Sequence, residues 1–207
     1  MHGNWRKLIR PRKIEFSENE TTATYGKFVA VPLERGFGIT IGNSLRRILL
    51  SSLQGAAFTG VKFDGVLHEF STIPGVSEDV TDIILNLKQV KMCLHEGEET
   101  TISINANKEG VVTAGDLIVS DKISILNPEQ PIATLNAEAN LKGELTVRIG
   151  KGYVPAENNK SEEDPVGTVA VDSIFSPISR CNYHVTNARV GQRTDYDKLT
   201  MEVWTDG

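Results

Sequence analysis

The sequence has 207 residues, of which 39% are apolar and 24% are charged, a composition typical of a globular protein and unlike that of a disordered one. It contains no apolar run near the roughly 20 residues of a membrane-spanning helix, and its basic amino terminus lacks the apolar stretch of a secretory signal. These features argue against a membrane or secreted protein, and the length allows one or two domains.

Basic charge is concentrated at the amino terminus. The first 13 residues contain five basic side chains and no acidic one: Arg6, Lys7, Arg10, Arg12 and Lys13. Because the formal net charge of the chain is −5, the remaining residues carry −10, and so acidic a body repels the phosphate backbone of DNA. We therefore expect no direct DNA binding and a solvated terminal arm. Contact of this arm with nucleic acid or with an acidic protein face is the alternative.

A strand and a helix are predicted first. Residues 27–33 alternate in the manner of a strand, and a glycine-containing turn follows. Five aliphatic side chains then recur at helical spacing: Ile41, Leu45, Ile48, Leu49 and Leu53. Thr40 or Asn43 could cap the start of this helix, and Gly55 suits the position just after its end. Arg46 and Arg47 flank the apolar stripe.

The middle of the chain is predicted to be rich in antiparallel strands. Strands are expected on both sides of a turn at Asp64 and Gly65. A second helix starts near Ser77 and has an apolar face made of Val80, Ile83, Ile84 and Leu87. Short alternating runs up to residue 149 indicate further strands, and residues 154–167 indicate a surface loop.

The end of the chain is predicted to be a hairpin. Tyr183 and Val185 can pair with an alternating run of Leu199, Met201 and Val203 across a polar connection. The two cysteines, Cys93 and Cys181, are too few for a disulfide framework and lack the spacing of a metal-binding motif. We interpret them as free structural thiols, with a disulfide or redox pair as the alternative.

The patterns of known nucleotide, metal and nucleophile sites do not fit. Gly36, Gly38 and Gly42 give G-x-G-x-x-x-G, one residue longer than the dinucleotide-binding turn, and no lysine stands where a P-loop requires one. The four histidines lack metal-ligand spacing with one another or with the cysteines. We therefore predict no catalytic residue, no metal and no cofactor.

The first helix is better suited to binding protein than to binding a nucleotide. Its aliphatic stripe exceeds what a small sheet needs, and a helix pair across a two-fold axis would bury it. The planar fork of an arginine suits carboxylates at a protein interface, so Arg46 and Arg47 are candidate contacts, with a solvated helix face as the alternative.

Several long segments resemble the amino-terminal region of the bacterial or plastid-type RNA polymerase alpha subunit. The resemblance is carried in order by LERGFGITIGNSLRRILLSSL (33–53), FDGVLHEFSTIPGVSEDVTDIILNLK (63–88), GKGYVPAE (150–157), SEED (161–164) and ARVGQRTDYDKLTMEVWTDG (188–207). It implies an α+β fold of two domains. Residues 1–53 and 177–207 would form a discontinuous dimerisation domain, and residues 54–176 an inserted, mostly antiparallel β domain.

The resemblance also implies a role and a set of sites. The chain would be a non-catalytic assembly scaffold that dimerises with a second alpha chain and recruits the beta and beta-prime subunits, in the bacterial cytoplasm at the nucleoid or in a plastid. Lys88 is implied as the beta-prime contact, and a regulator-facing loop that transcription activators contact is implied at Glu162, Glu163 and Asp164. The implied dimer interface is Phe37, Leu45, Ile48, Leu49 and Leu53. The implied beta-subunit contacts are Arg46, Arg47, Leu50, His68 and Glu69.

The resemblance leaves one departure and two alternatives. Relatives continue into a long helix that crosses the partner, then a linker and a DNA-binding domain, and the sequence given ends at Gly207 without them. This predicts a weak dimer or an exposed apolar patch. The alternatives are a small β-rich ligand-binding or enzymatic domain with an unrecognised pocket, and a nucleic-acid binder that uses the basic arm.

Overall fold

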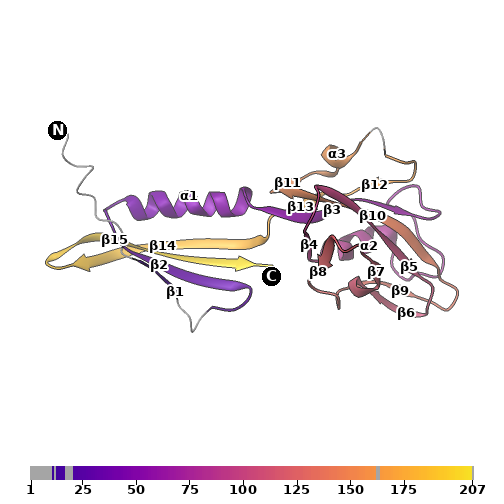
Figure 1. Cartoon of the computed structure of the whole chain (residues 1–207), viewed down its shortest axis with the longest axis horizontal. Coiled ribbons are helices and arrows are strands. Elements are labelled where there is room, and N and C mark those ends of the chain that lie inside the picture. The colour runs from indigo at the N-terminus through magenta and orange to yellow at the C-terminus, as the bar shows by residue number, and fades with distance from the viewer. Residues whose placement is uncertain (1–10, 12, 17–20, 162–163, 207) are drawn as a thin grey trace. The chain divides into compact units, whose positions relative to one another are not determined.

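The computed structural model of the chain describes residues 11, 13–16, 21–161 and 164–206. The described residues form two compact units (Figure 1). The first unit takes in the described residues of Met1–Leu53 and Pro177–Gly207, and the second is Gln54–Ser176. The fold is α+β, with mostly antiparallel strands and few helices, as the sequence predicts.

The first unit contains a four-stranded antiparallel sheet in the order β1-β2-β15-β14. Its strands are β1 (Lys13–Phe16), β2 (Tyr25–Leu33), β14 (Ile178–Val190) and β15 (Arg193–Thr205). Pairing of β2 with β15 joins the two separate stretches of chain that make up this unit. The predicted terminal hairpin is confirmed, because Tyr183 lies opposite Met201 and Val185 lies opposite Leu199.

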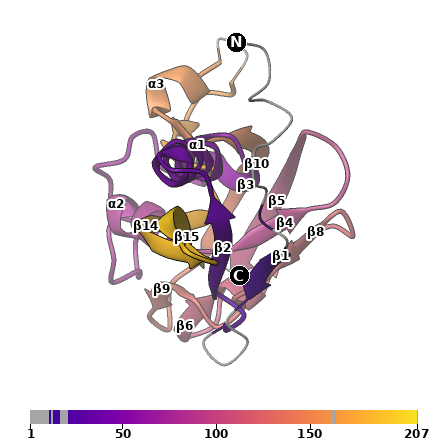
Figure 2. The same cartoon turned by 90° about the vertical axis from the view of Figure 1, so that its left-hand side faces the viewer.

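Helix α1 (Phe37–Ser51) packs over β14 and β15 of this sheet (Figure 2). The predicted bounds of the helix were wrong at both ends. The N-cap is Gly36, in the left-handed conformation with φ of 87°, and neither Thr40 nor Asn43 has this role. The C-cap is Ser52, and Gly55 belongs to the next strand.

The second unit is built on a five-stranded antiparallel sheet in the order β12-β3-β10-β5-β7. Its members are β3 (Gln54–Phe63), β5 (Glu99–Ala106), β7 (Leu117–Ile118), β10 (Leu141–Lys151) and β12 (Val169–Ala170). Three two-stranded pairs accompany the sheet: β4 (Met92–Leu94) with β8 (Ile123–Ile125), β6 (Gly110–Thr113) with β9 (Pro131–Leu135), and β11 (Tyr153–Val154) with β13 (Ser173–Ile174). A 3₁₀ turn, η2 (Ala114–Asp116), precedes β7.

Helix α2 (Val80–Leu87) contributes its predicted apolar face to the core of the second unit. All four side chains of that face are buried: Val80, Ile83, Ile84 and Leu87. The N-cap is Asp79, whose Oδ1 accepts a hydrogen bond of 2.7 Å from the backbone N–H of Asp82, and not the predicted Ser77.

Two loop predictions need correction. The turn at Asp64 and Gly65 is present, with φ of 79° at Gly65, but β3 ends before it and residues 66–70 form no strand. In that segment only Val66 is buried, while Leu67 and Phe70 are 74% and 79% exposed, so the apolar side chains do not share one buried strand face. The predicted surface loop at 154–167 contains a short helix, α3 (Ala156–Asn159).

Candidate protein-interaction surface

The start of α1 is held by a side chain from the other end of the sequence. Asp197 of β15 is buried, and its Oδ2 accepts hydrogen bonds of 2.8 Å from the N–H of Gly36 and 3.0 Å from the N–H of Gly38. The first N–H groups of a helix lack partners within the helix, and a negative charge there is favourable. The carboxylate therefore fixes the first turn of α1 to the sheet.

Two glycines let the backbone of α1 lie directly on the sheet. Both Gly38 and Gly42 are buried. A Cβ at Gly38 would lie 2.8 Å from Val185 Cγ1, and a Cβ at Gly42 would lie 2.6 Å from Tyr183 Cδ2, both closer than real Cβ contacts. At the start of α1, glycines rather than large aliphatic side chains face the strands.

The last turn of α1 and the residues just after it supply the apolar side chains that the first turns lack. Leu49, Leu50 and Leu53 are partly buried against a core that contains Cys181 and Met201. Burial raises the pKa of the Cys181 thiol, and the positive charge of Arg46 opposes this rise. These leucines therefore stabilise the unit's own fold, whatever else they contact.

The remaining apolar side chains of α1 are exposed. Phe37, Leu45 and Ile48 are 44%, 39% and 52% exposed, and with the half-buried Ile41 they recur every three or four residues. Such spacing places them on one flank of a helix, which we call the α1 flank. Ile39, 59% exposed, lies on the opposite side. The single stripe that the sequence predicts is thus divided between the core and an exposed flank.

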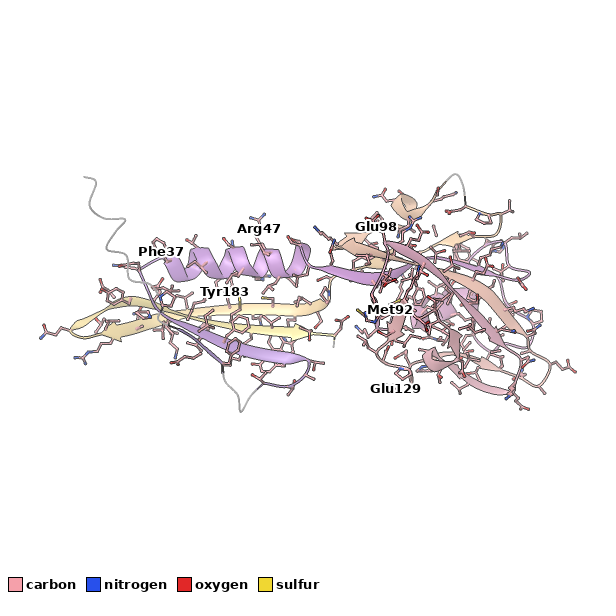
Figure 3. All side chains as sticks on the ribbon, viewed as in Figure 1. Phe37, Arg47, Met92, Glu98, Glu129 and Tyr183 are labelled. Carbon is pink, nitrogen blue, oxygen red and sulfur yellow. The ribbon has the colours of Figure 1, made fainter. Side chains whose placement is uncertain are left out.

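The two arginines occupy different positions. Arg47 projects from α1 on the side away from the strands (Figure 3), and it is exposed. Arg46 lines a surface hollow of about 410 Å³ with Asn182, His184 and Glu202. Among the described residues no ion pair is formed by either arginine. Both guanidinium groups are therefore available to another molecule.

His68 and Glu69 are exposed in the second unit, between the exposed Leu67 and Phe70. Ser71 Oγ lies 3.2 Å from His68 Nδ1, and the Glu69 carbonyl accepts a hydrogen bond of 2.9 Å from Thr81 Oγ1. The resemblance named the two polar residues but not these exposed apolar neighbours.

Lys88 forms an ion pair with Asp172 across the second unit. The hydrogen bond from Lys88 is the main reason that the pKa of the Asp172 carboxyl is lowered, and partial burial opposes this effect. A partner at Lys88 would therefore meet a paired ammonium group.

Only Asp164 of the predicted regulator-facing loop lies within the described residues. Glu162 and Glu163 lie outside the described residues. Asp164 closes a local turn, in which its Oδ2 accepts a hydrogen bond of 2.7 Å from the backbone N–H of Ser161.

The first unit also contains aromatic and apolar side chains that no sequence pattern singled out. The rings of Tyr25 and Trp204 lie 5.0 Å apart between centroids, and the Arg180 guanidinium lies 4.7 Å from the Trp204 ring. Ile14 and Phe16 on β1 are 56% and 65% exposed. The alternation predicted for β15 concerned the strand face opposite to Trp204, and no sequence pattern pointed to the other side chains.

Among the described residues, no group of three or more histidine, cysteine or acidic side chains is placed to hold a metal ion. Both cysteines are free thiols, as predicted. None of the described helices is sufficiently long and apolar to span a bilayer.

Comparison with known proteins gives a consistent result. The family described as the RNA polymerase Rpb3/RpoA insert domain matches residues 61–176. The chain is 58% identical over 207 residues to the DNA-directed RNA polymerase subunit alpha of Geobacter metallireducens, and 58% identical over 207 residues to that of Pelobacter propionicus. It is 63% identical over 183 residues, 88% of the chain, to that of Moorella thermoacetica. The chain spans 61%, 61% and 58% of these relatives' lengths, respectively.

Proposed function

Because the chain belongs to the RNA polymerase alpha-subunit family, we propose that it is a non-catalytic assembly scaffold of DNA-directed RNA polymerase, working in the bacterial cytoplasm at the nucleoid. In this role it pairs with a second alpha chain and recruits the beta and beta-prime subunits. The observation that carries the proposal is the α1 flank, an apolar surface on a helix that is already fixed to its sheet. The alternative of a β-rich enzymatic domain has no comparable support.

The α1 flank is proposed as the dimer interface. An interface across a two-fold axis uses the same patch twice, so one helix flank supplies both halves of the contact. The helix is held by Asp197 at its start and by Leu49 and Leu53 near its end, so binding orders little backbone and loses little affinity to entropy. Phe37, Leu45 and Ile48 make this contact, while Leu49 and Leu53 support it from within.

Arg47 is proposed as the central contact to the beta subunit. Its guanidinium has no ion-pair partner within the described residues, so it can hold a carboxylate of the partner in a bidentate contact. Arg46 directly precedes it, and Leu50 follows three residues later and is partly buried in the unit's own core. His68 and Glu69 offer a second beta contact, flanked by Leu67 and Phe70.

The beta-prime and activator contacts are proposed at two other places. Lys88 offers a beta-prime contact as half of an ion pair with Asp172, so the partner would need to recognise both charges. The acidic loop at Glu162, Glu163 and Asp164 is proposed to contact activators.

Dimerisation is tested by exchanging one exposed isoleucine at a time. Sedimentation equilibrium at micromolar concentration should give a weaker dimer for Ile48→Ser than for the parent chain. Ile39→Ser is the matched control, since Ile39 has similar exposure on the opposite side of α1. If both variants dimerise as the parent does, the α1 flank is not the interface.

Recruitment is tested by capture of the beta subunit on the immobilised chain. Arg47→Ala should retain the parent's unfolding midpoint but reduce capture, because loss of one partner of a desolvated charge pair costs about 2–5 kcal/mol. Arg189→Ala, an exposed arginine in the terminal hairpin, should capture beta normally. An unfolded Arg47→Ala chain would show instead that this arginine is structural.

A further inference from the structure

A cysteine, a histidine and a serine meet on the surface of the second unit, where β4 pairs with β8. Cys93 lies directly opposite Ser124 in this pairing. On either side of Cys93, Met92 and Leu94 are buried, so strand alternation turns the thiol outward, and Cys93 is exposed. His95 follows β4, and its backbone N–H donates a hydrogen bond of 2.7 Å to the carbonyl of Lys122. The three side chains are thus held by paired backbone.

The His95 imidazole lies between the serine hydroxyl and the cysteine thiol, with one ring nitrogen near each. His95 Nε2 lies 2.9 Å from Ser124 Oγ, and His95 Nδ1 lies 3.9 Å from Cys93 Sγ. A neutral imidazole has one nitrogen that donates and one that accepts. When Nε2–H donates to Ser124 Oγ, the lone pair of Nδ1 faces the thiol. A nucleophile, an adjacent base and a third group that orients the base form the arrangement that activates thiols.

We propose that Cys93 is a site of reversible thiol modification by small disulfides, with His95 as the proton acceptor. The thiol proton passes to His95 Nδ1, and the sulfur attacks one sulfur atom of the disulfide. A new S–S bond forms as the S–S bond of the small disulfide breaks, and the electron pair leaves with its departing sulfur. That thiolate takes the proton from His95 and departs as a free thiol, so no other oxidant is needed.

The chain contains an internal reference for this reaction. Cys181 is 3% exposed in the core of the first unit, and burial raises the pKa of its thiol. Both properties slow disulfide exchange, which needs an accessible thiolate. Modification of the folded chain should therefore be selective for Cys93.

Oxidised glutathione is the probe. The 207-residue chain is incubated with an excess of it, quenched in acid, digested and examined by mass spectrometry over time. The Cys93 peptide should gain one glutathionyl group, which a reducing agent removes, before the Cys181 peptide gains any. An unassisted thiol is only a few per cent thiolate near pH 7, so assistance can raise the rate by at most about thirtyfold. We expect His95→Gln to slow the reaction about tenfold.

Three comparisons make the test decisive. His184→Gln, which changes an exposed histidine of the other unit, should react at the parent rate. Ser124→Ala should slow the reaction less than His95→Gln, because the imidazole stays but loses its orientation. In denaturant the parent and His95→Gln should react equally, since the folded geometry is then absent. Equal native rates for these two chains, or equal modification of both cysteines, would overturn the proposal.

Discussion

The buried carboxylate of Asp197 should be the most sensitive position for the stability of the first unit. One oxygen, Oδ2, accepts both hydrogen bonds from the start of α1. Asp197→Ala leaves two backbone N–H groups without an acceptor. An unsatisfied buried donor costs about 1–3 kcal/mol, and a lost N-cap costs about 0.5–2 kcal/mol. Because the N–H of Gly36 is only part-buried and can regain water, we expect a loss of about 2–4 kcal/mol in the free energy of unfolding.

Asp197→Asn separates the hydrogen bonds from the charge. An amide oxygen in the place of Oδ2 can accept the same two bonds, while the negative charge at the helix start is lost. The interaction of such a charge with the helix is worth about 0.3–1 kcal/mol, and up to about 2 kcal/mol when partly buried. The asparagine variant should therefore lose about 0.5–2 kcal/mol, clearly less than the alanine variant.

Urea unfolding followed by tryptophan fluorescence measures both losses, because Trp204 lies on β15 of the first unit. Asp121→Ala, which removes an exposed carboxylate from the second unit, is the control and should leave this transition unchanged. A loss below about 0.5 kcal/mol for Asp197→Ala would refute the reasoning. If the asparagine variant lost as much as the alanine variant, charge would be the main contribution.

Three further changes test the packing and the electrostatics. Gly42→Ala should destabilise the first unit by about 1 kcal/mol in the same urea assay. Overpacking against Tyr183 costs about 1–3 kcal/mol, while the higher helix propensity of alanine returns at most about 1 kcal/mol. A more stable variant would mean that the Tyr183 ring moves aside freely. Leu49→Ala should lower the free energy of unfolding by about 2 kcal/mol in that assay, the low end for a leucine, because Leu49 is only partly buried. An unchanged midpoint would show that Leu49 does not contribute to the core. Asp172→Asn should lower the stability of the second unit near pH 6 by under about 1 kcal/mol, since both partners in the ion pair with Lys88 are partly exposed. Because the pKa of Asp172 is lowered in the folded state, the ion pair stabilises the unit above the ordinary carboxyl pKa of 3.8, and this stabilisation is lost as the pH falls through the folded-state pKa. If the parent and Asp172→Asn still differed in stability in circular dichroism melts at pH 2, the assignment would be contradicted.

Helix α2 and the terminal hairpin were predictable because their signals are local. The apolar side chains of α2 all face one core, so their spacing alone identified the buried face. In the hairpin, alternation predicted the two paired strands, and the structure supplies the register, in which Tyr183 lies opposite Met201. Only the cap of α2 was misplaced, by two residues, because Ser77 and Asp79 are both good capping residues.

Helix α1 was harder to predict because its determinants are distant in the sequence. The acceptor for its first N–H groups, Asp197, is 161 positions from Gly36 in the sequence. No local pattern could therefore indicate that a helix starts there. Closely spaced glycines such as Gly38 and Gly42 are typical of a turn, and only their close approach to the strands explains why they stand in a helix. For the same reason the spacing of the aliphatic residues could not show which of them face the sheet.

The candidate site depended on resemblance more than on pattern. Periodicity indicated an apolar helix that binds protein, but it could not assign Arg47, His68 or Lys88 to particular partners, and those assignments remain proposals. The structure adds that Lys88 already has a partner in Asp172, and that Leu67 and Phe70 accompany His68. Neither fact follows from spacing, since both depend on how loops pack.

The discontinuity of the first unit has a consequence for its biogenesis. During translation β1, β2 and α1 emerge first, and the whole of Gln54–Ser176 must follow before β14 and β15 exist. At roughly 5–20 residues per second this delay is on the order of ten seconds. A nascent chain arrested before residue 177 should thus expose α1 to protease while the second unit is already resistant. Until the last two strands are synthesised, α1 lacks both the Asp197 carboxylate and the core that it packs against. We therefore expect a chaperone to bind its apolar side chains during this interval.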